Sequence, residues 1–282
     1  MDILRFFVGA CLGSFVNLIA LRYDPDKFLF RREVVLGRSR CPGCGKPLRW
    51  FELIPFVSFL LQLGRCRRCG AGLSIRYPLV ELAAGLIVLF VPARLEAFSV
   101  SPLHPIVPIA WISAMLLLFL VALVDARTKI IPDEANILLV ALGAIVAWYV
   151  APHFSQVTGS FVGSSALLLG YRENVLVNRV VAVVFSALLF GFLVSATRGR
   201  GMGMGDAKLG LALAVLFGWP DVLLIFVLSF IIGSITGFMD IAFRKRTLKS
   251  HVPFGPFLVL ASALVFFWGE EIVGWYVGLI RT

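Results

Sequence analysis

The chain has 282 residues, of which 60% are hydrophobic and 15% are charged, with a formal net charge of +10. Soluble domains carry roughly 25% charged residues, so this composition excludes an ordinary soluble enzyme. Uncharged stretches of about 20 residues, enough for a helix to cross the hydrocarbon core, recur along the chain, as from Pro105 to Val124. The sequence therefore predicts an all-α polytopic membrane protein with about eight transmembrane helices.

The predicted spans alternate with polar segments. In chain order they are 3–21, 78–92, a span ending at 124, 134–150, 177–196, a span from the glycine-rich 198–210 segment to 217, a span from 222 to 243, and 254–277. We therefore expect a first transmembrane helix (1–21), a loop domain (22–77) and a membrane-embedded domain (78–282).

The distribution of positive charge predicts the orientation. When successive loops are placed alternately on the two sides of the membrane, 21 of the 26 Lys and Arg residues fall on one side. Of these, 12 lie in the segment from Arg22 to Arg76. Basic loops mark the cytoplasmic side, so we expect the N-terminus outside and the loop domain in the cytoplasm. The positive charge favours contact with anionic lipid headgroups, and no nucleic-acid partner is expected.

Four cysteines in the loop domain form two Cys-x-x-Cys pairs, Cys41 with Cys44 and Cys66 with Cys69. Two such pairs can surround a zinc ion tetrahedrally, and disulfides are disfavoured in the reducing cytosol. Four protein ligands would close the site, so we expect a structural Zn²⁺. Unligated thiols or a redox pair are the alternatives.

Two aspartates lie at the ends of predicted spans on the cytoplasmic side. Asp125 ends the third span and Asp206 begins the sixth. Charge at such positions is costly and suggests function, although a single aspartate at a helix end is more often a cap. Two close carboxylates cannot both ionise easily, so one can activate water while the other protonates a leaving group. The pair therefore predicts aspartic proteolysis.

The glycine-rich segment before Asp206 supports this interpretation. Gly203 and Gly205 lack Cβ atoms, so the backbone there can approach a peptide closely or turn sharply. The 13 residues from Gly205 to Phe217 span only about 20 Å as a helix, less than the roughly 30 Å of hydrocarbon. We therefore expect Asp206 inside the membrane plane, in a hydrated recess.

Four segments in this order resemble the bacterial prepilin peptidases, also called type IV leader peptidases. They are GSFVNLIALR (13–22), the cysteine loop (39–81), VDARTKIIPD (124–133) and GMGMGDAKL (201–209). The last contains the GxGD signature that presenilin-like and archaeal preflagellin peptidases share. The resemblance covers nearly the whole chain.

The resemblance implies a GxGD-type intramembrane aspartic protease of the bacterial inner membrane, with Asp125 and Asp206 as its catalytic dyad. It implies cleavage of type IV prepilins or type II secretion pseudopilins on the cytoplasmic side, after the glycine that ends a short basic leader. Many members also methylate the new N-terminal residue with S-adenosylmethionine. We expect Glu52, Asp133 and Glu134 to attract the basic leader; Glu52 stands where many members have Asn or Asp, a difference that concerns the methylation step.

Other classes of function predict different behaviour. A transporter would use the aspartates as a cation site. A zinc-loop scaffold without chemistry would tolerate loss of both aspartates but not of the cysteines. A membrane methyltransferase alone would not remove a leader.

Overall fold

The computed structural model describes residues 1–29, 31–35, 37, 39–41, 43–98, 104–151, 160–170, 174–198, 202–243 and 253–281. These residues contain no β-strand, only two isolated β-bridges, so the expected all-helical fold is confirmed. They form two compact units, residues 1–95 and 96–282, which are described separately below and called unit 1 and unit 2. Part of the predicted segment between spans four and five, residues 152–159 and 171–173, lies outside the described residues.

Seven helices of the described residues are long and apolar enough to cross a membrane. They are α1 (Asp2–Arg22), α4 (Arg76–Phe98), α5 (Ile106–Thr128), α6 (Asp133–Val150), α7 (Val175–Thr197), α9 (Asp221–Ala242) and α10 (Gly255–Arg281). The predicted sixth span is the shorter α8 (Met204–Phe217), with 14 residues. Its length is about 21 Å at 1.5 Å per residue, too short for a full crossing of the hydrocarbon.

In unit 1, α1 and α4 approach each other through small residues. A Cβ atom at Gly9 would lie 2.7 Å from the carbonyl oxygen of Ala84, and one at Gly13 would lie 2.6 Å from the Cβ of Ala84. Small residues allow this close backbone approach in membrane helices. The segment between these helices contains the short elements α2 (Arg32–Val35), η1 (Trp50–Leu53) and α3 (Val57–Leu61).

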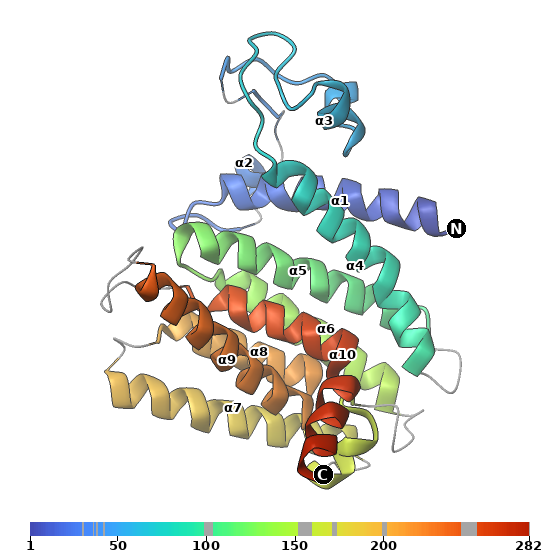
Figure 1. Ribbon diagram of the computed structural model, residues 1–282, viewed down its shortest axis with the longest axis vertical. Coiled ribbons are helices and arrows are strands. Elements are labelled where there is room, and N and C mark those ends of the chain that lie inside the picture. The colour runs from blue at the N-terminus through green and yellow to red at the C-terminus, as the bar shows by residue number, and fades with distance from the viewer. Residues whose placement is uncertain are drawn as a thin grey trace. The chain divides into compact units, whose positions relative to one another are not determined.

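In unit 2, α8 forms the centre and lies between α6 and α7 (Figure 1). Leu209, Leu213 and Leu216 of α8 are completely buried. The backbones come close at two glycines: a Cβ at Gly143 of α6 would lie 2.8 Å from the Cα of Leu216, and a Cβ at Gly210 would contact the ring of Phe190. The burial of α8 inside protein explains how so short a helix is stable within the membrane-embedded unit.

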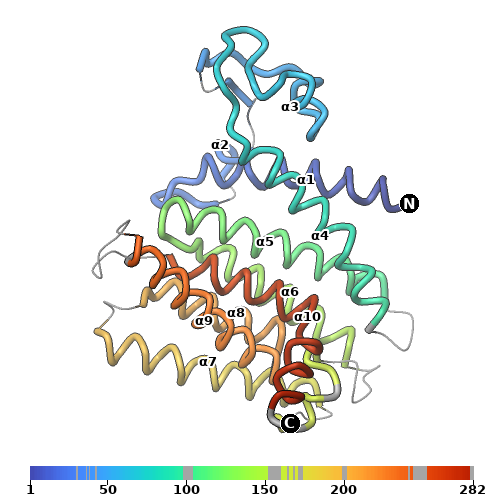
Figure 2. Tube along the Cα trace, in the orientation of Figure 1, coloured from blue at the N-terminus to red at the C-terminus, as the bar shows by residue number. Residues whose placement is uncertain are grey.

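The helix ends of unit 2 are connected by buried polar contacts. Asp221, at the start of α9, is fully buried. It accepts hydrogen bonds from Ser160 Oγ (2.7 Å) and from the amides of Phe161 and Val162 (3.2 Å each). These residues precede η3 (Gly163–Leu169). The α10 helix begins near the C-terminal end of α9, the end opposite to Asp221. It then runs alongside α9 and α5, as the Cα trace shows (Figure 2).

Candidate active site and metal centre

Asp125 lies in the last turn of α5 and is only 3% exposed. Its Oδ2 accepts a hydrogen bond from the backbone amide of Gly255 at 3.0 Å. Gly255 is the first residue of α10, and the first amides of a helix have no intrahelical partner. The carboxylate of one helix therefore caps another helix from 130 positions away.

Asp206 lies in the first turn of α8 and is half-buried. Its Oδ2 accepts a hydrogen bond from the amide of Gly203, the N-cap residue, at 3.2 Å. A carboxylate at this position also interacts favourably with the helix dipole. The segments PFGP (253–256) and MGMGD (202–206) each lead into a helix. Asp206 therefore lies at the N-terminus of its own helix, α8, and Asp125 lies at the N-terminus of α10.

The two carboxylates lie within electrostatic reach of each other. Ile131, which is buried just before α6, lies close to Gly205, which precedes Asp206, and to Gly255, the partner of Asp125. A Cβ at Gly205 would be 3.4 Å from Ile131 Cβ, and one at Gly255 would be 3.3 Å from Ile131 Cδ1. The fold therefore brings the end of α5 and the starts of α8 and α10 together around one apolar side chain.

Asp133 and Glu134 begin α6 beside this group. Both carboxylate oxygens of Asp133 accept hydrogen bonds from Lys208 Nζ, at 2.8 and 2.7 Å. The side chains of Asp133 and Lys208 are both exposed. A basic peptide would therefore compete with Lys208 for the carboxylate of Asp133. Glu134 is half-buried next to it.

Glu52 belongs to unit 1, whereas Asp125 and Asp206 belong to unit 2. It belongs to η1 and is 8% exposed. Its Oε2 accepts a hydrogen bond from the amide of Arg49 at 2.7 Å, which caps this short helix. The structure therefore gives Glu52 a local capping contact within the cysteine-containing loop.

The four cysteines of unit 1 converge. The sulfur atoms of Cys41, Cys44, Cys66 and Cys69 all lie within 4.8 Å of one another, and Cys41 and Cys69 are 3.7 Å apart. Four thiolates around Zn²⁺ with Zn–S bonds of 2.3 Å are about 3.8 Å apart, so the cluster can hold a metal ion.

Each cysteine pair lies on a turn of the same construction. The amide of Gly45 donates to the carbonyl of Cys41 at 2.9 Å, and the amide of Gly70 donates to the carbonyl of Cys66 at 2.9 Å. Both glycines have a positive φ, 69° and 70°, a conformation that favours glycine. The repeated Cys-x-x-Cys-Gly pattern thus encodes two matching turns.

The turns also affect the thiols. Hydrogen bonds from the amides of Cys44 and Gly43 hold the pKa of the Cys41 thiol below its usual value. The amide of Ala71 lowers the pKa of Cys69, but desolvation and the three neighbouring cysteines outweigh it and raise this pKa to about 11. Four close thiols of this kind are suited to share a cation that replaces their protons.

Gly255 is a site residue that the sequence interpretation missed. The available signal was PFGP (253–256), a proline and glycine pair directly before an apolar stretch. Proline at the second position of α10 has no amide hydrogen to satisfy there, and glycine leaves room for the carboxylate. Only the contact with Asp125 reveals its connection to the aspartates.

Comparison with known proteins agrees with this arrangement. Residues 7–95 match the bacterial peptidase A24 N-terminal domain, and residues 112–238 match the type IV leader peptidase family. The chain is 32% identical to a prepilin leader peptidase/N-methyltransferase of Aeromonas hydrophila over 97% of this chain and 92% of that protein. It is 30% identical to one of Pseudomonas aeruginosa, over 95% and 91% of the two chains. No solved structure shows significant similarity.

The chain therefore belongs to the type IV leader peptidase family. Since the described part of the chain contains seven apolar helices of spanning length, it is a multi-pass membrane protein. The family assignment confirms the resemblance found in the sequence, whereas the roles of the individual site residues stay predictions.

Proposed function

We propose that this protein is a membrane aspartic endopeptidase that removes the leader of type IV prepilins or type II secretion pseudopilins, and that it then methylates the new N-terminus. The relatives in Aeromonas hydrophila and Pseudomonas aeruginosa bear both activities in their names. The observation that supports the peptidase activity most directly is that Gly205, next to Asp206, and Gly255, which binds Asp125, both lie beside Ile131.

The pair is suited to general acid–base catalysis. One carboxylate accepts a proton from water as the water attacks the peptide carbonyl, and the other donates a proton to the departing amine. The amide of Gly255 holds one oxygen of Asp125 in place. Because close carboxylates titrate jointly, the proton belongs to the pair rather than to either residue.

The substrate fits the position of the site. A prepilin has a basic leader, then glycine, then an apolar helix. Glycine allows the peptide to extend past Gly203 and Gly205 toward the carboxylates. We expect the N-terminus outside the inner membrane and the site on the cytoplasmic side, because the loops on that side contain most of the Lys and Arg residues. Anionic headgroups, Asp133 and Glu134 would attract the leader.

The cysteine cluster is proposed to bind one structural Zn²⁺. Four thiolates leave no open coordination position for substrate or water, which is typical of structural zinc sites. The ion would connect the two cysteine turns and stabilise a loop with few buried apolar residues. For the methylation step, S-adenosylmethionine supplies the methyl group when bound.

The alternative functions are not favoured. A transporter or a non-catalytic scaffold would not account for the match to peptidase and methyltransferase relatives over nearly the full chain. Incubation of the detergent-solubilised protein with a prepilin and S-adenosylmethionine tests the proposal. Mass spectrometry should show loss of the leader and then a gain of one methyl group; an intact prepilin would contradict it.

A further inference from the structure

Ile131 packs against the immediate neighbours of both aspartates. Among the described residues, the atoms nearest to a Cβ placed at Gly205, which precedes Asp206, would be Cβ, Cγ1 and Cδ1 of Ile131, at 3.4, 3.7 and 3.8 Å. A Cβ at Gly255 would lie 2.6 Å from Asp125 Oδ2 and 3.3 Å from Ile131 Cδ1. One isoleucine side chain therefore contacts the glycine next to one aspartate and the glycine that binds the other.

These residues differ in their depth below the protein surface. Asp125 is 3% exposed and Ile131 is 7% exposed, whereas Asp206 is half-buried and Gly203 is exposed. We therefore expect a peptide to approach from the side of Gly203 and Asp206 and to reach Asp125 last. Ile131 lies beside that deeper carboxylate, at the inner end of the approach.

The position of Ile131 is fixed by its neighbours in the chain. It precedes Pro132, the N-cap residue of α6, and a residue before proline is biased toward extended conformations. Its side chain is branched at Cβ, which leaves few rotamers. Because the backbone is restricted and the side chain packs on two sides, Ile131 cannot easily move aside for an additional substrate group.

The proposed reaction requires the cleaved peptide bond to lie within hydrogen-bonding distance of both carboxylates. The attacked carbonyl carbon belongs to the residue before the bond, and the Cα atom of that residue is only about 1.5 Å away. A side chain on this Cα would enter the space next to the carboxylates, part of which Ile131 already fills. A glycine brings the same carbonyl to the carboxylates without a Cβ atom.

We infer that Ile131 determines which residue is accepted before the cleaved bond and that it limits this residue to glycine; the inference rests on the proposed peptidase function. The physical basis is close packing, because an extra methyl group in a filled space forces its neighbours apart. In a fitted pocket, one such group changes reaction rates about 10- to 200-fold. Ile131 has no group that transfers protons, so it determines specificity and takes no part in the chemistry.

The surroundings of Ile131 show which substitutions test this role. A side chain at Gly205 or Gly255 would only remove room, whereas a shorter side chain at position 131 adds room. Ile131→Val removes Cδ1, the methyl group that approaches Gly255, and Ile131→Ala also removes both Cγ atoms. Ile130 is 45% exposed and is not among the nearest neighbours of either glycine, so Ile130→Ala is the matched control.

The experiment compares two prepilins that differ only in the residue before the cleaved bond, glycine or alanine. Initial rates of leader loss are measured by mass spectrometry for the unmodified protein and the three variants in detergent. The unmodified protein should cleave the glycine prepilin about 100-fold faster than the alanine prepilin. Ile131→Ala should lower this ratio about tenfold by raising the rate on the alanine prepilin, Ile131→Val should lower it less, and Ile130→Ala should keep it.

The ratio of the two rates does not depend on how much of a variant is folded, because partial unfolding lowers both rates equally. If the unmodified protein cleaves neither prepilin, the proposed peptidase function fails. If it cleaves both equally well, or if the Ile131 variants keep its ratio, this inference fails while the proposed function stands. Loss of all cleavage in both Ile131 variants would indicate a structural role and would also overturn the inference.

Discussion

The amide of Gly255 donates a hydrogen bond to Oδ2 of Asp125 at 3.0 Å, joining the start of α10 to the end of α5. A Cβ atom at Gly255 would lie 2.6 Å from that oxygen, which is too close for a real contact. The absence of a side chain at position 255 is therefore what allows the carboxylate to reach the helix N-terminus. This contact leads to the first prediction.

Gly255→Ala should lower the rate of leader cleavage about 10- to 100-fold, because the added methyl group displaces the Asp125 carboxylate and small misplacements in active sites are costly. The rate is measured by mass spectrometry of prepilin in detergent. Gly274→Ala in the same helix, where an added Cβ meets nothing within 4 Å, is the control and should retain the full rate. Equal rates for the two variants would contradict the role of the contact.

Asp125→Asn and Asp206→Asn should each lower leader cleavage by about 10³-fold, within the range of general acid–base contributions. Asp240→Asn, near the end of α9, serves as the matched acidic control and should cleave normally. The assay is the same single-substrate mass measurement. If either dyad variant cleaved the leader at the normal rate, the proposed catalytic pair would be wrong.

Charge reversal at Asp133 or Glu134 should slow cleavage of leaders that have many Lys or Arg residues more than cleavage of leaders with few. The physical reason is attraction between these acids and the basic leader, in competition with Lys208 at 2.7 Å from Asp133. Cleavage rates for a series of leaders with different basic counts test this. The same decrease for every leader would argue against charge recognition.

The ion pair itself should contribute little to stability. Because Lys208 and Asp133 are both exposed, their interaction is screened and such pairs are worth about 0–1 kcal/mol. A double-mutant cycle of Asp133→Asn and Lys208→Gln, followed by thermal unfolding, measures the coupling. A coupling energy well above that range would indicate a structural pair rather than an available recognition site.

Substitution of one cysteine of the cluster should remove the bound metal. The purified protein should contain about one Zn²⁺ per chain by elemental analysis, and Cys41→Ser should lose it, because structural zinc sites need all their ligands. The four cysteines lie in unit 1, whereas both aspartates lie in unit 2. Cys11→Ser, in α1 and outside the cysteine cluster, is the control.

Gly143→Ala should destabilise the protein by about 1–3 kcal/mol, as overpacking of tight contacts does. Its Cβ would lie 2.8 Å from the backbone of Leu216, and backbone cannot move aside as a flexible side chain can. Gly191→Ala in α7 meets nothing within 4 Å and should leave the melting temperature unchanged. Thermal unfolding in the same detergent compares the two.

Much of the helical architecture follows from local patterns. The hydropathy of the chain predicted the seven long helices, and the limited length of the 205–217 segment predicted a helix too short to cross fully. The second span, predicted as 78–92 or longer, continues in α4 through Pro92 to Phe98, because neighbouring groups in a membrane protein can compensate for the missing amide hydrogen. The matching cysteine spacing predicted the cluster, since each pair is held by a short turn.

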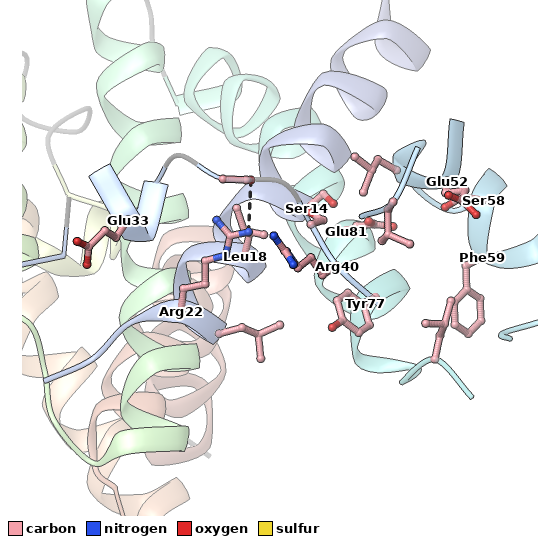
Figure 3. A pocket seen from close by; sticks show the side chains of 16 residues that line it. Ser14, Leu18, Arg22, Glu33, Arg40, Glu52, Ser58, Phe59, Tyr77 and Glu81 are labelled. Carbon is pink, nitrogen blue, oxygen red and sulfur yellow. Dashed lines mark hydrogen bonds between the residues drawn. The ribbon is translucent and has the colours of Figure 1, made fainter. Parts of the chain in front are cut away.

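Contacts between distant segments could not be predicted in this way. The pairing of Asp133 with Lys208 spans 75 positions, and that of Asp125 with Gly255 spans 130. The residues 253–256 themselves do not indicate that the amide of Gly255 donates to an aspartate. Unit 1 likewise contains a cavity of about 580 Å³, and its lining residues come from α1, α4 and the loop, which are far apart in the sequence (Figure 3).

Hydropathy and cysteine spacing are properties of neighbouring residues, so the amino-acid sequence alone was sufficient to determine the membrane class, the order of the helices and a four-cysteine cluster that could hold a metal ion. Which helix ends meet depends on how buried helices pack, here on glycines that allow α8 to lie close to α6 and α7. The tertiary structure therefore decided that Gly255 binds Asp125, that Lys208 pairs with Asp133, and that residues of α1, α4 and the loop line one cavity in unit 1.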